Sequence, residues 1–178
     1  IRDRLYEHAQ IIQKNGGPLE GIGMQAHFGS LLTSIPDLKT IYDRFSTLNV
    51  PLQITELDID VSDEQTQADY MRDFVTMTFS HPNVNGIMLW GFWTQQHWRP
   101  QAAFYTKDWQ LRPVGQAWID LVHKQWKTNE TGTTDANGAY SVRGFLGDYD
   151  VTVTIDGKPT TSQGVLESAG NQVEVKLP

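Results

Sequence analysis

Two pairs of polar residues stand at the ends of apolar segments whose composition is typical of β-strands. Gln25 and His27 close the first segment, and Glu56 and Asp58 close the second. In each pair the residues are two positions apart, so both side chains project from one face of an extended strand. Carboxylates and imidazoles are groups that proteins use for nucleophilic and acid–base chemistry. We therefore expect one polar site where these two strands end.

These residues alone leave three uses open for the polar groups: solvated strand ends, ligands of a divalent cation, or the groups of an active site. One histidine and two carboxylates form a set that hard cations accept, but the sequence has neither HxH nor HExxH spacing. A metal-dependent β/α-barrel hydrolase built on His27, Glu56 and Asp58 is thus kept as an alternative. The leading expectation is a site without a metal or other cofactor.

Aromatic residues follow a third apolar segment. Trp90 and Trp98 border the loop that leaves it. Aromatic faces offer apolar surface to the C–H faces of sugar rings, while polar strand ends can bind hydroxyl groups. The tryptophans farther along the chain are expected to pack in the core, as large aromatics usually do: Trp109, Trp118 and Trp126.

The elements that must position these groups alternate between helix and strand. Apolar spacing and helix-start signals predict, in chain order, helix 1–15, strand 21–27, a helix from Ser34 through Phe45, strand 51–58, helix 62–80, strand 85–91 and helix 113–126. Strands separated by single helices pair in parallel through right-handed crossovers. The fold class is therefore α/β, either an open doubly wound sheet or part of a β/α barrel, whose functional groups gather where the strands end.

Composition divides the chain and excludes several classes of protein. All six tryptophans lie in residues 1–127, whereas residues 128–178 contain short alternating runs rich in Thr, Gly, Asp and Val. We expect two domains, the second small and all-β, with turns at 134–138 and 156–157. A formal charge of −7 without a basic stripe argues against a nucleic-acid partner. No apolar run approaches the roughly 20 residues of a membrane helix, and the lack of cysteine excludes disulfides.

Three motifs resemble those of family-ten glycoside hydrolases, the endo-β-1,4-xylanases. They are Gly21-Ile-Gly-Met-Gln-Ala-His27, Ile54-Thr-Glu-Leu-Asp58 and Leu89-Trp-Gly, with a further tryptophan eight residues after that of Trp-Gly. The resemblance implies that residues 1–127 are the last three βα units of a (β/α)8 TIM barrel that hydrolyses xylan and xylo-oligosaccharides. Residues 128–178 are similar to a small β-sandwich of the carboxypeptidase-regulatory kind.

The resemblance also implies a role for each polar residue. Glu56 matches the catalytic nucleophile, His27 matches the histidine bonded to it, and Asp58 matches the acid that orients this histidine. Gln25 matches a residue beside the substrate at the cleavage point. Trp90 and Trp98 match the two tryptophans that border the sugar next to the scissile bond.

The chain departs from the family's pattern at two points. Thr94 stands where many members carry an acidic residue, so a non-catalytic carbohydrate-binding barrel is a further alternative. The family's acid/base glutamate follows an asparagine at the end of the fourth strand, but here Asn129-Glu130 lies in the linker. We therefore expect the acid/base to be missing, the chain to be a fragment, and the fragment to be inactive alone. A polymeric substrate that cells do not import also implies an extracellular protein.

Overall fold

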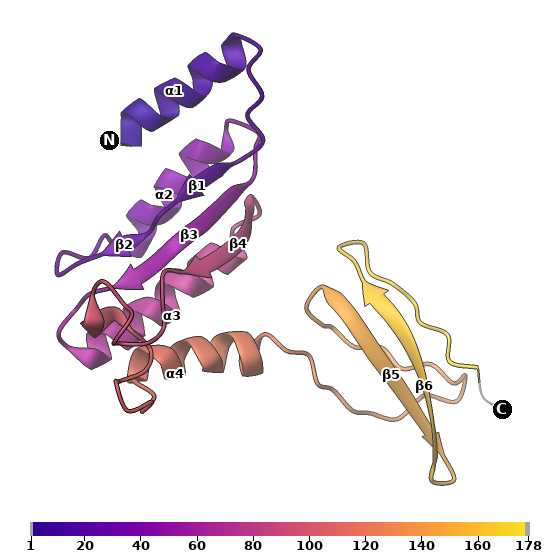
Figure 1. Ribbon diagram of the computed structural model, residues 1–178. Helices are drawn as coiled ribbons and strands as arrows, with labels where there is room; N and C mark the ends of the chain where they lie inside the picture. Colours follow the sequence, from indigo (N-terminus) through magenta and orange to yellow (C-terminus); the bar gives the residue numbers. More distant parts are fainter. Residues whose placement is uncertain (1, 177–178) are drawn as a thin grey trace. The chain divides into compact units, whose positions relative to one another are not determined.

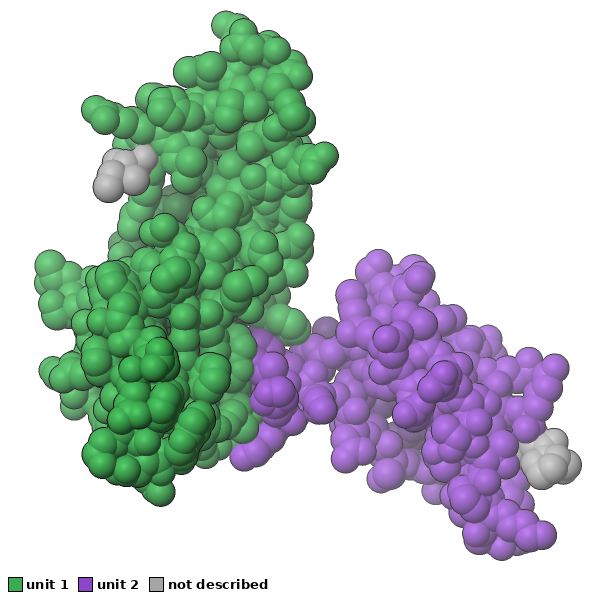
Figure 2. All heavy atoms as spheres, viewed as in Figure 1, with its two compact units in different colours: residues 1–121 green, residues 122–178 purple. Residues whose placement is uncertain are grey.

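The computed structural model describes residues 2–176, which form two units with a division between Leu121 and Val122 (Figure 2). This division lies a few residues before the 127/128 boundary expected from composition. Leu121 is buried and directly follows the last helix of the first unit. Within the described residues, no helix is long and apolar enough to cross a membrane.

The first unit alternates helices and strands, as the apolar periodicity predicts (Figure 1). In chain order it contains α1 (Arg2–Lys14), β1 (Ile22–Met24), β2 (His27–Phe28), α2 (Ile35–Ser46), β3 (Leu52–Ile59), α3 (Glu64–Ser80), β4 (Val84–Leu89), a 3-10 turn (Pro100–Ala102) and α4 (Pro113–Asp120). One π-helical turn, Leu121–Gln125, follows α4.

The strands of the first unit pair in parallel, and β3 lies at the centre of their sheet. β1 and β2 both pair with β3, and β4 pairs along the opposite edge of β3, since Leu52 has both Ile22 and Val84 as partners. The two crossovers therefore advance across the sheet in one direction. Because such crossovers are right-handed, α2 and α3 lie on the same face of the sheet. Both helices lie behind the strands in Figure 1. This order is that of a β/α barrel rather than a doubly wound sheet.

The core of this unit lies between β3 and the helices that cover it. Leu52, Ile54 and Ile59 of β3 have no exposed surface, and Phe74 of α3 is also fully buried. Each such side chain contributes about 1.5–3 kcal/mol through its burial. Trp109, which was expected in the core, is instead 57% exposed, because it lies in a turn before α4 rather than on a helix face.

Both long helices that follow strands begin at a side-chain cap. Ser34 Oγ accepts from the Asp37 N–H at 3.3 Å, as expected from the start signal before α2. For α3, the sequence favoured a capping box beginning at Ser62. The cap is instead Asp63, whose carboxylate accepts from the Thr66 N–H at 2.7 Å. An anion at a helix N-terminus also interacts favourably with the helix dipole.

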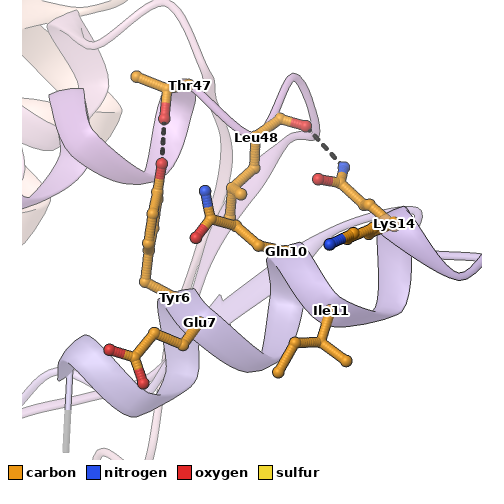
Figure 3. A pocket seen from close by; sticks show the side chains of 8 residues that line it. Tyr6, Glu7, Gln10, Ile11, Lys14, Thr47 and Leu48 are labelled. Atoms are coloured by element: carbon orange, nitrogen blue, oxygen red, sulfur yellow. Dashed lines mark hydrogen bonds between the residues drawn. The ribbon is translucent and has the colours of Figure 1, made fainter.

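Helix α1 is attached to the connection between α2 and β3. The Tyr6 hydroxyl lies 2.7 Å from Thr47 Oγ1, and Gln13 Nε2 donates to the Leu48 carbonyl at 2.8 Å (Figure 3). The hollow between them has a volume of about 660 Å³. Its lining residues belong to α1 and this connection, and none of them is a predicted site residue.

The second unit contains an antiparallel hairpin. Strands β5 (Gly147–Ile155) and β6 (Lys158–Leu166) pair along their whole length. Asp156 (φ 49°) and Gly157 (φ 75°) close the hairpin with the positive φ values of a type I′ turn. This confirms the turn expected at 156–157. The turn expected at 134–138 is also present, since the Asp135 carboxylate accepts from the N–H groups of Asn137 and Ala139.

Candidate active site

His27 reaches the carboxyl end of β3 because the neighbouring strand is interrupted just before it. Ala26 has a φ of 64°, a left-handed conformation that is uncommon for a residue with a side chain. Met24 pairs with Ile54 and His27 pairs with Asp58, so three steps along one strand span four steps along β3. The continuous strand expected over 21–27 is therefore wrong, and the break fixes the register of the imidazole against β3.

Gln25 lies in this break and not in a strand. Its carbonyl accepts from the Glu56 N–H at 3.1 Å, so the backbone of Gln25 is held beside the candidate nucleophile. Its side chain is exposed. The expectation that Gln25 and His27 share one strand face does not hold, because Ala26 turns the chain between them.

Glu56, His27 and Asp58 form a linear chain of side chains. His27 Nε2 lies 3.2 Å from Glu56 Oε2, and His27 Nδ1 lies 3.0 Å from Asp58 Oδ2. The Asp58 side chain has no exposed surface, whereas 23% of the Glu56 side chain is exposed. The buried carboxylate therefore orients the imidazole, and the imidazole orients a carboxylate that a ligand can reach.

This geometry does not favour a metal site. The two ring nitrogens of an imidazole point in different directions, and here each faces a different carboxylate. One ion bound to His27 would therefore lie beside Glu56 or Asp58 but not beside both. Among residues 2–176, no group of three or more His, Cys, Asp or Glu side chains is arranged to hold a metal ion.

Two exposed indoles border the imidazole. The ring centroid of His27 is 5.8 Å from that of Trp90 and 5.0 Å from that of Trp98. Trp98 Nε1 also donates to Asp58 Oδ2 at 2.6 Å. Half or more of each tryptophan is exposed. Apart from the Gln25 side chain, the predicted site residues thus form a single cluster, in which Glu56 is partly exposed to solvent and the two indoles border His27.

Comparison with known proteins identifies the family. The sequence profile of glycosyl hydrolase family 10 matches residues 2–120, which is most of the chain. The chain belongs to glycosyl hydrolase family 10. Solved structures similar to this family-10 chain include xylanase 10B from Thermotoga petrophila RKU-1 in complex with xylobiose. The two have a TM-score of 0.62 and are 22% identical over 68% of this chain and 41% of that one. This likeness shows the fold, part of the family's β/α barrel.

The curated relatives of the family-10 chain include both a protein named as a regulatory factor and proteins named as xylanases. The anti-sigma-I factor RsgI6 of Acetivibrio thermocellus is 39% identical over 148 residues, which cover 83% of this chain and 19% of the relative. Endo-1,4-beta-xylanase 1 of Arabidopsis thaliana is 33% identical over 159 residues, which cover 89% of this chain and 16% of the relative. The chain thus spans less than a fifth of each. An alignment of 159 residues is longer than unit 1, so the similarity extends into unit 2.

The sequence analysis missed Arg99 of the family-10 chain. Its guanidinium carbon lies 4.3 Å from the Trp98 ring, and Nη1 donates to the Phe28 carbonyl at 3.2 Å. Nη1 is also 3.7 Å from Asp58 Oδ1. A buried carboxylate requires a compensating charge, and the Arg99 guanidinium supplies one for Asp58. The path of the loop that brings Arg99 back to β2 was not readable from the sequence.

His97 is a second residue that the sequence did not single out. It is buried, and its Nδ1 accepts from the Arg99 N–H at 3.0 Å. Burial lowers the pKa of His97, and the nearby Asp58 carboxylate partly opposes this shift. A Cβ at Gly91 would lie 2.9 Å from His97 Cδ2, so a side chain at position 91 would displace this ring.

Thr94, which departs from the family's pattern, stabilises the loop after β4 through two hydrogen bonds. Its hydroxyl donates to the Tyr105 carbonyl at 2.7 Å, and its N–H donates to the same carbonyl at 3.0 Å. An ionised acidic side chain has no hydrogen to donate to a carbonyl. Threonine at this position therefore supports the loop that carries Trp90 and Trp98.

Proposed function

We propose that this chain is the C-terminal part of an endo-β-1,4-xylanase, a retaining glycoside hydrolase that acts on xylan and xylo-oligosaccharides. The observation that carries the proposal is the chain of Glu56, His27 and Asp58, which ends on a solvent-accessible carboxylate and whose imidazole is bordered by two exposed indoles. Membership of family 10 and relatives that are named endo-1,4-beta-xylanases support it.

In the proposed reaction, a Glu56 carboxylate oxygen attacks the anomeric carbon of a bound xylose. The bond from that carbon to the leaving oxygen breaks, and a second carboxyl group protonates this oxygen. Water, deprotonated by the same second group, then releases the sugar from Glu56. His27 positions the attacking carboxylate, Asp58 positions His27, and no cofactor is required.

Two indoles and one amide are proposed to bind the substrate. Trp90 and Trp98 offer exposed faces beside His27, to which the apolar faces of a pyranose ring can pack. The exposed Gln25 side chain is available to sugar hydroxyls. We propose that the acid/base carboxyl, which must lie roughly 5–5.5 Å from the nucleophile, comes from a strand outside this chain.

The experiment that tests the proposal is Glu56→Gln in the full-length protein. Removing the nucleophile should lower turnover of xylan by on the order of 10⁴-fold or more, while binding of xylan is retained. Glu64→Gln, at the exposed start of α3, is the matched control and should leave turnover unchanged. Unchanged turnover in Glu56→Gln would remove Glu56 from the role.

A second candidate function is a non-catalytic carbohydrate-binding barrel within a regulatory protein. The observation that favours it is the 39% identity to a relative named an anti-sigma-I factor. In that case the wild-type full-length protein binds xylan but does not hydrolyse it. Turnover that Glu56→Gln abolishes would exclude this candidate.

We also infer that β1 with β2, β3 and β4 are the last three strands of the eightfold barrel. Residues 128–178, which make up most of unit 2, are proposed to be a small β-sandwich with a packing or spacer role. Their β5–β6 hairpin and an alignment that extends beyond unit 1 support this inference. An extracellular location, where polymeric xylan is found, is part of the same proposal.

A further inference from the structure

We propose that Phe92, Trp93 and Trp109 form an aromatic platform that binds pyranose rings of a polysaccharide outside the cleft of Glu56. The proposal rests on the proposed function, because that function supplies the class of ligand, an uncharged β-linked polysaccharide. It adds a binding surface made by residues outside the candidate site, one of which, Trp109, was expected to pack in the core.

The platform is built on a stack of two indoles. The rings of Trp93 and Trp109 are nearly parallel, 9° apart in plane and 5.0 Å apart in centroid. Phe92 lies beside them, with its centroid 6.4 Å from that of Trp109. Tyr105 also lies against Trp109, with centroids 5.9 Å apart and planes tilted by 53°, and Trp109 is nevertheless 57% exposed. Phe92 is itself 54% exposed.

Trp109 is held outward by a strained and well-bonded turn. Its φ of 61° is an outlier for a bulky side chain, and such strain persists only where the surrounding structure enforces it. The Trp109 N–H donates to the Thr106 carbonyl at 3.1 Å, and the Gln110 N–H donates to Thr106 Oγ1 at 3.1 Å. A tryptophan that served only as packing would not require an exposed face in a strained turn. A rigid, flat and exposed indole suits stacking on a ring.

The platform continues the surface of the candidate site. Phe92 and Trp93 follow Trp90 by two and three residues, so Trp93 Cα lies at most about 11 Å from Trp90 Cα. The Phe92 carbonyl accepts from the Tyr105 N–H at 2.8 Å, which ties this loop to the segment that carries Trp109. The two charged residues that precede Trp109 in the sequence, Lys107 and Asp108, pair with each other at 2.8 Å. An apolar surface whose neighbouring charges cancel fits a neutral sugar better than a charged partner.

The test measures the affinity of the full-length protein for soluble xylan, with Glu56→Gln present so that nothing is hydrolysed. Trp109→Gly removes the ring but accepts the positive φ without strain. The dissociation constant should rise roughly 2- to 10-fold, as expected for the loss of one aromatic contact. Trp109→Tyr, which keeps an aromatic ring, should have a dissociation constant between those of the parent and of Trp109→Gly. Phe79→Ala, at an exposed aromatic of α3, is the control and should bind as the parent does.

Several results would overturn the proposal. They are unchanged xylan affinity in Trp109→Gly and a parent protein that binds no xylan. A change of oligomeric state in Trp109→Gly would assign the surface to self-association instead. The proposed function fails separately. If Glu56→Gln leaves turnover unchanged while Trp109→Gly weakens xylan binding, the proposal of a binding platform is supported and the proposed role of Glu56 is not.

Discussion

Asp58 is the residue on which the site converges, because three groups from β2 and from the loop after β4 lie near its carboxylate. His27 Nδ1 comes from β2, Trp98 Nε1 from the loop after β4, and the Arg99 guanidinium follows Trp98 in that loop. The hydrogen bond from Trp98 to this carboxylate contributes about 1.5–3 kcal/mol, as hydrogen bonds to charged groups do. The negative charge of Asp58 therefore orients the imidazole and holds one of the two bordering indoles.

Asp58→Asn tests this role. The amide is of similar size and its oxygen still accepts from Trp98, but it no longer attracts His27 and Arg99. We predict a fall in kcat of about 10- to 100-fold, which corresponds to the loss of one charge-assisted contact. Steady-state kinetics of the full-length protein measure it, with Asp69→Asn on the exposed face of α3 as the control. An unchanged kcat in Asp58→Asn would show that the orientation of His27 does not depend on this charge.

His97 should make stability depend on pH. Burial, which lowers its pKa, outweighs the opposing effects of Asp58 and Asp60, and His27 lowers the pKa further. The unfolded chain then binds a proton at a higher pH than the folded protein does. Stability is therefore full above the ordinary pKa of about 6.5 and is lost as the pH falls below it.

The measurement is the free energy of unfolding in urea between pH 8 and pH 5. His97→Asn, whose side-chain oxygen can still accept from the Arg99 N–H, should lose less stability over this range than the wild type. The difference between the two proteins removes the contributions of the other histidines. Parallel pH dependences would contradict the prediction.

At the scale of the elements, the break between β1 and β2 is the feature that places His27. Ala26→Val puts a β-branched side chain at a φ of 64° and should destabilise the protein by about 1–3 kcal/mol. Ala26→Gly should be neutral or stabilising, since glycine accepts this conformation. Urea unfolding of both variants measures the effect. Equal stability of Ala26→Val and the wild type would mean that the strand continues through residue 26.

The elements also show what the sequence can and cannot predict. Apolar periodicity predicted the alternation of helices and strands and the parallel sheet, because burial on one face leaves a repeat in the sequence. It missed the break at Ala26, since alanine gives no signal for a positive φ. The capping-box spacing of residues 62–65 placed the cap of α3 at Ser62 rather than at the adjacent Asp63, because both residues can cap a helix.

The sequence predicted the candidate site at the strand ends and at the two motif tryptophans, but not elsewhere on the loops. His27, Glu56 and Asp58 lie at or next to strand ends whose pairing follows from the βα order. Arg99 and the exposure of Trp109 depend on the path of the chain between β4 and α4. That path has little regular structure and is fixed by individual hydrogen bonds, such as that from Thr94 to the Tyr105 carbonyl.

At the scale of the whole molecule, the proposed function gives this chain one of the two carboxyl groups of the mechanism. We predict that the 178-residue chain alone releases no xylo-oligosaccharides from xylan. Without general acid catalysis, departure of a sugar leaving group loses on the order of 10²–10⁴-fold in rate. Chromatography of the products after incubation with xylan is the measurement, and the full-length protein is the positive control. Release of xylo-oligosaccharides by the chain alone would place both carboxyls within it.

The identity of the nucleophile is tested most directly by trapping it. A 2-deoxy-2-fluoro xylobioside with a dinitrophenolate leaving group requires no protonation of the departing oxygen, so Glu56 should displace it in the full-length protein and form a covalent glycosyl-enzyme. Mass spectrometry of the digested protein should then find one added glycosyl group on the peptide that contains Glu56, and none in Glu56→Gln. An adduct on a different carboxylate, or release of dinitrophenolate without any adduct, would contradict the account.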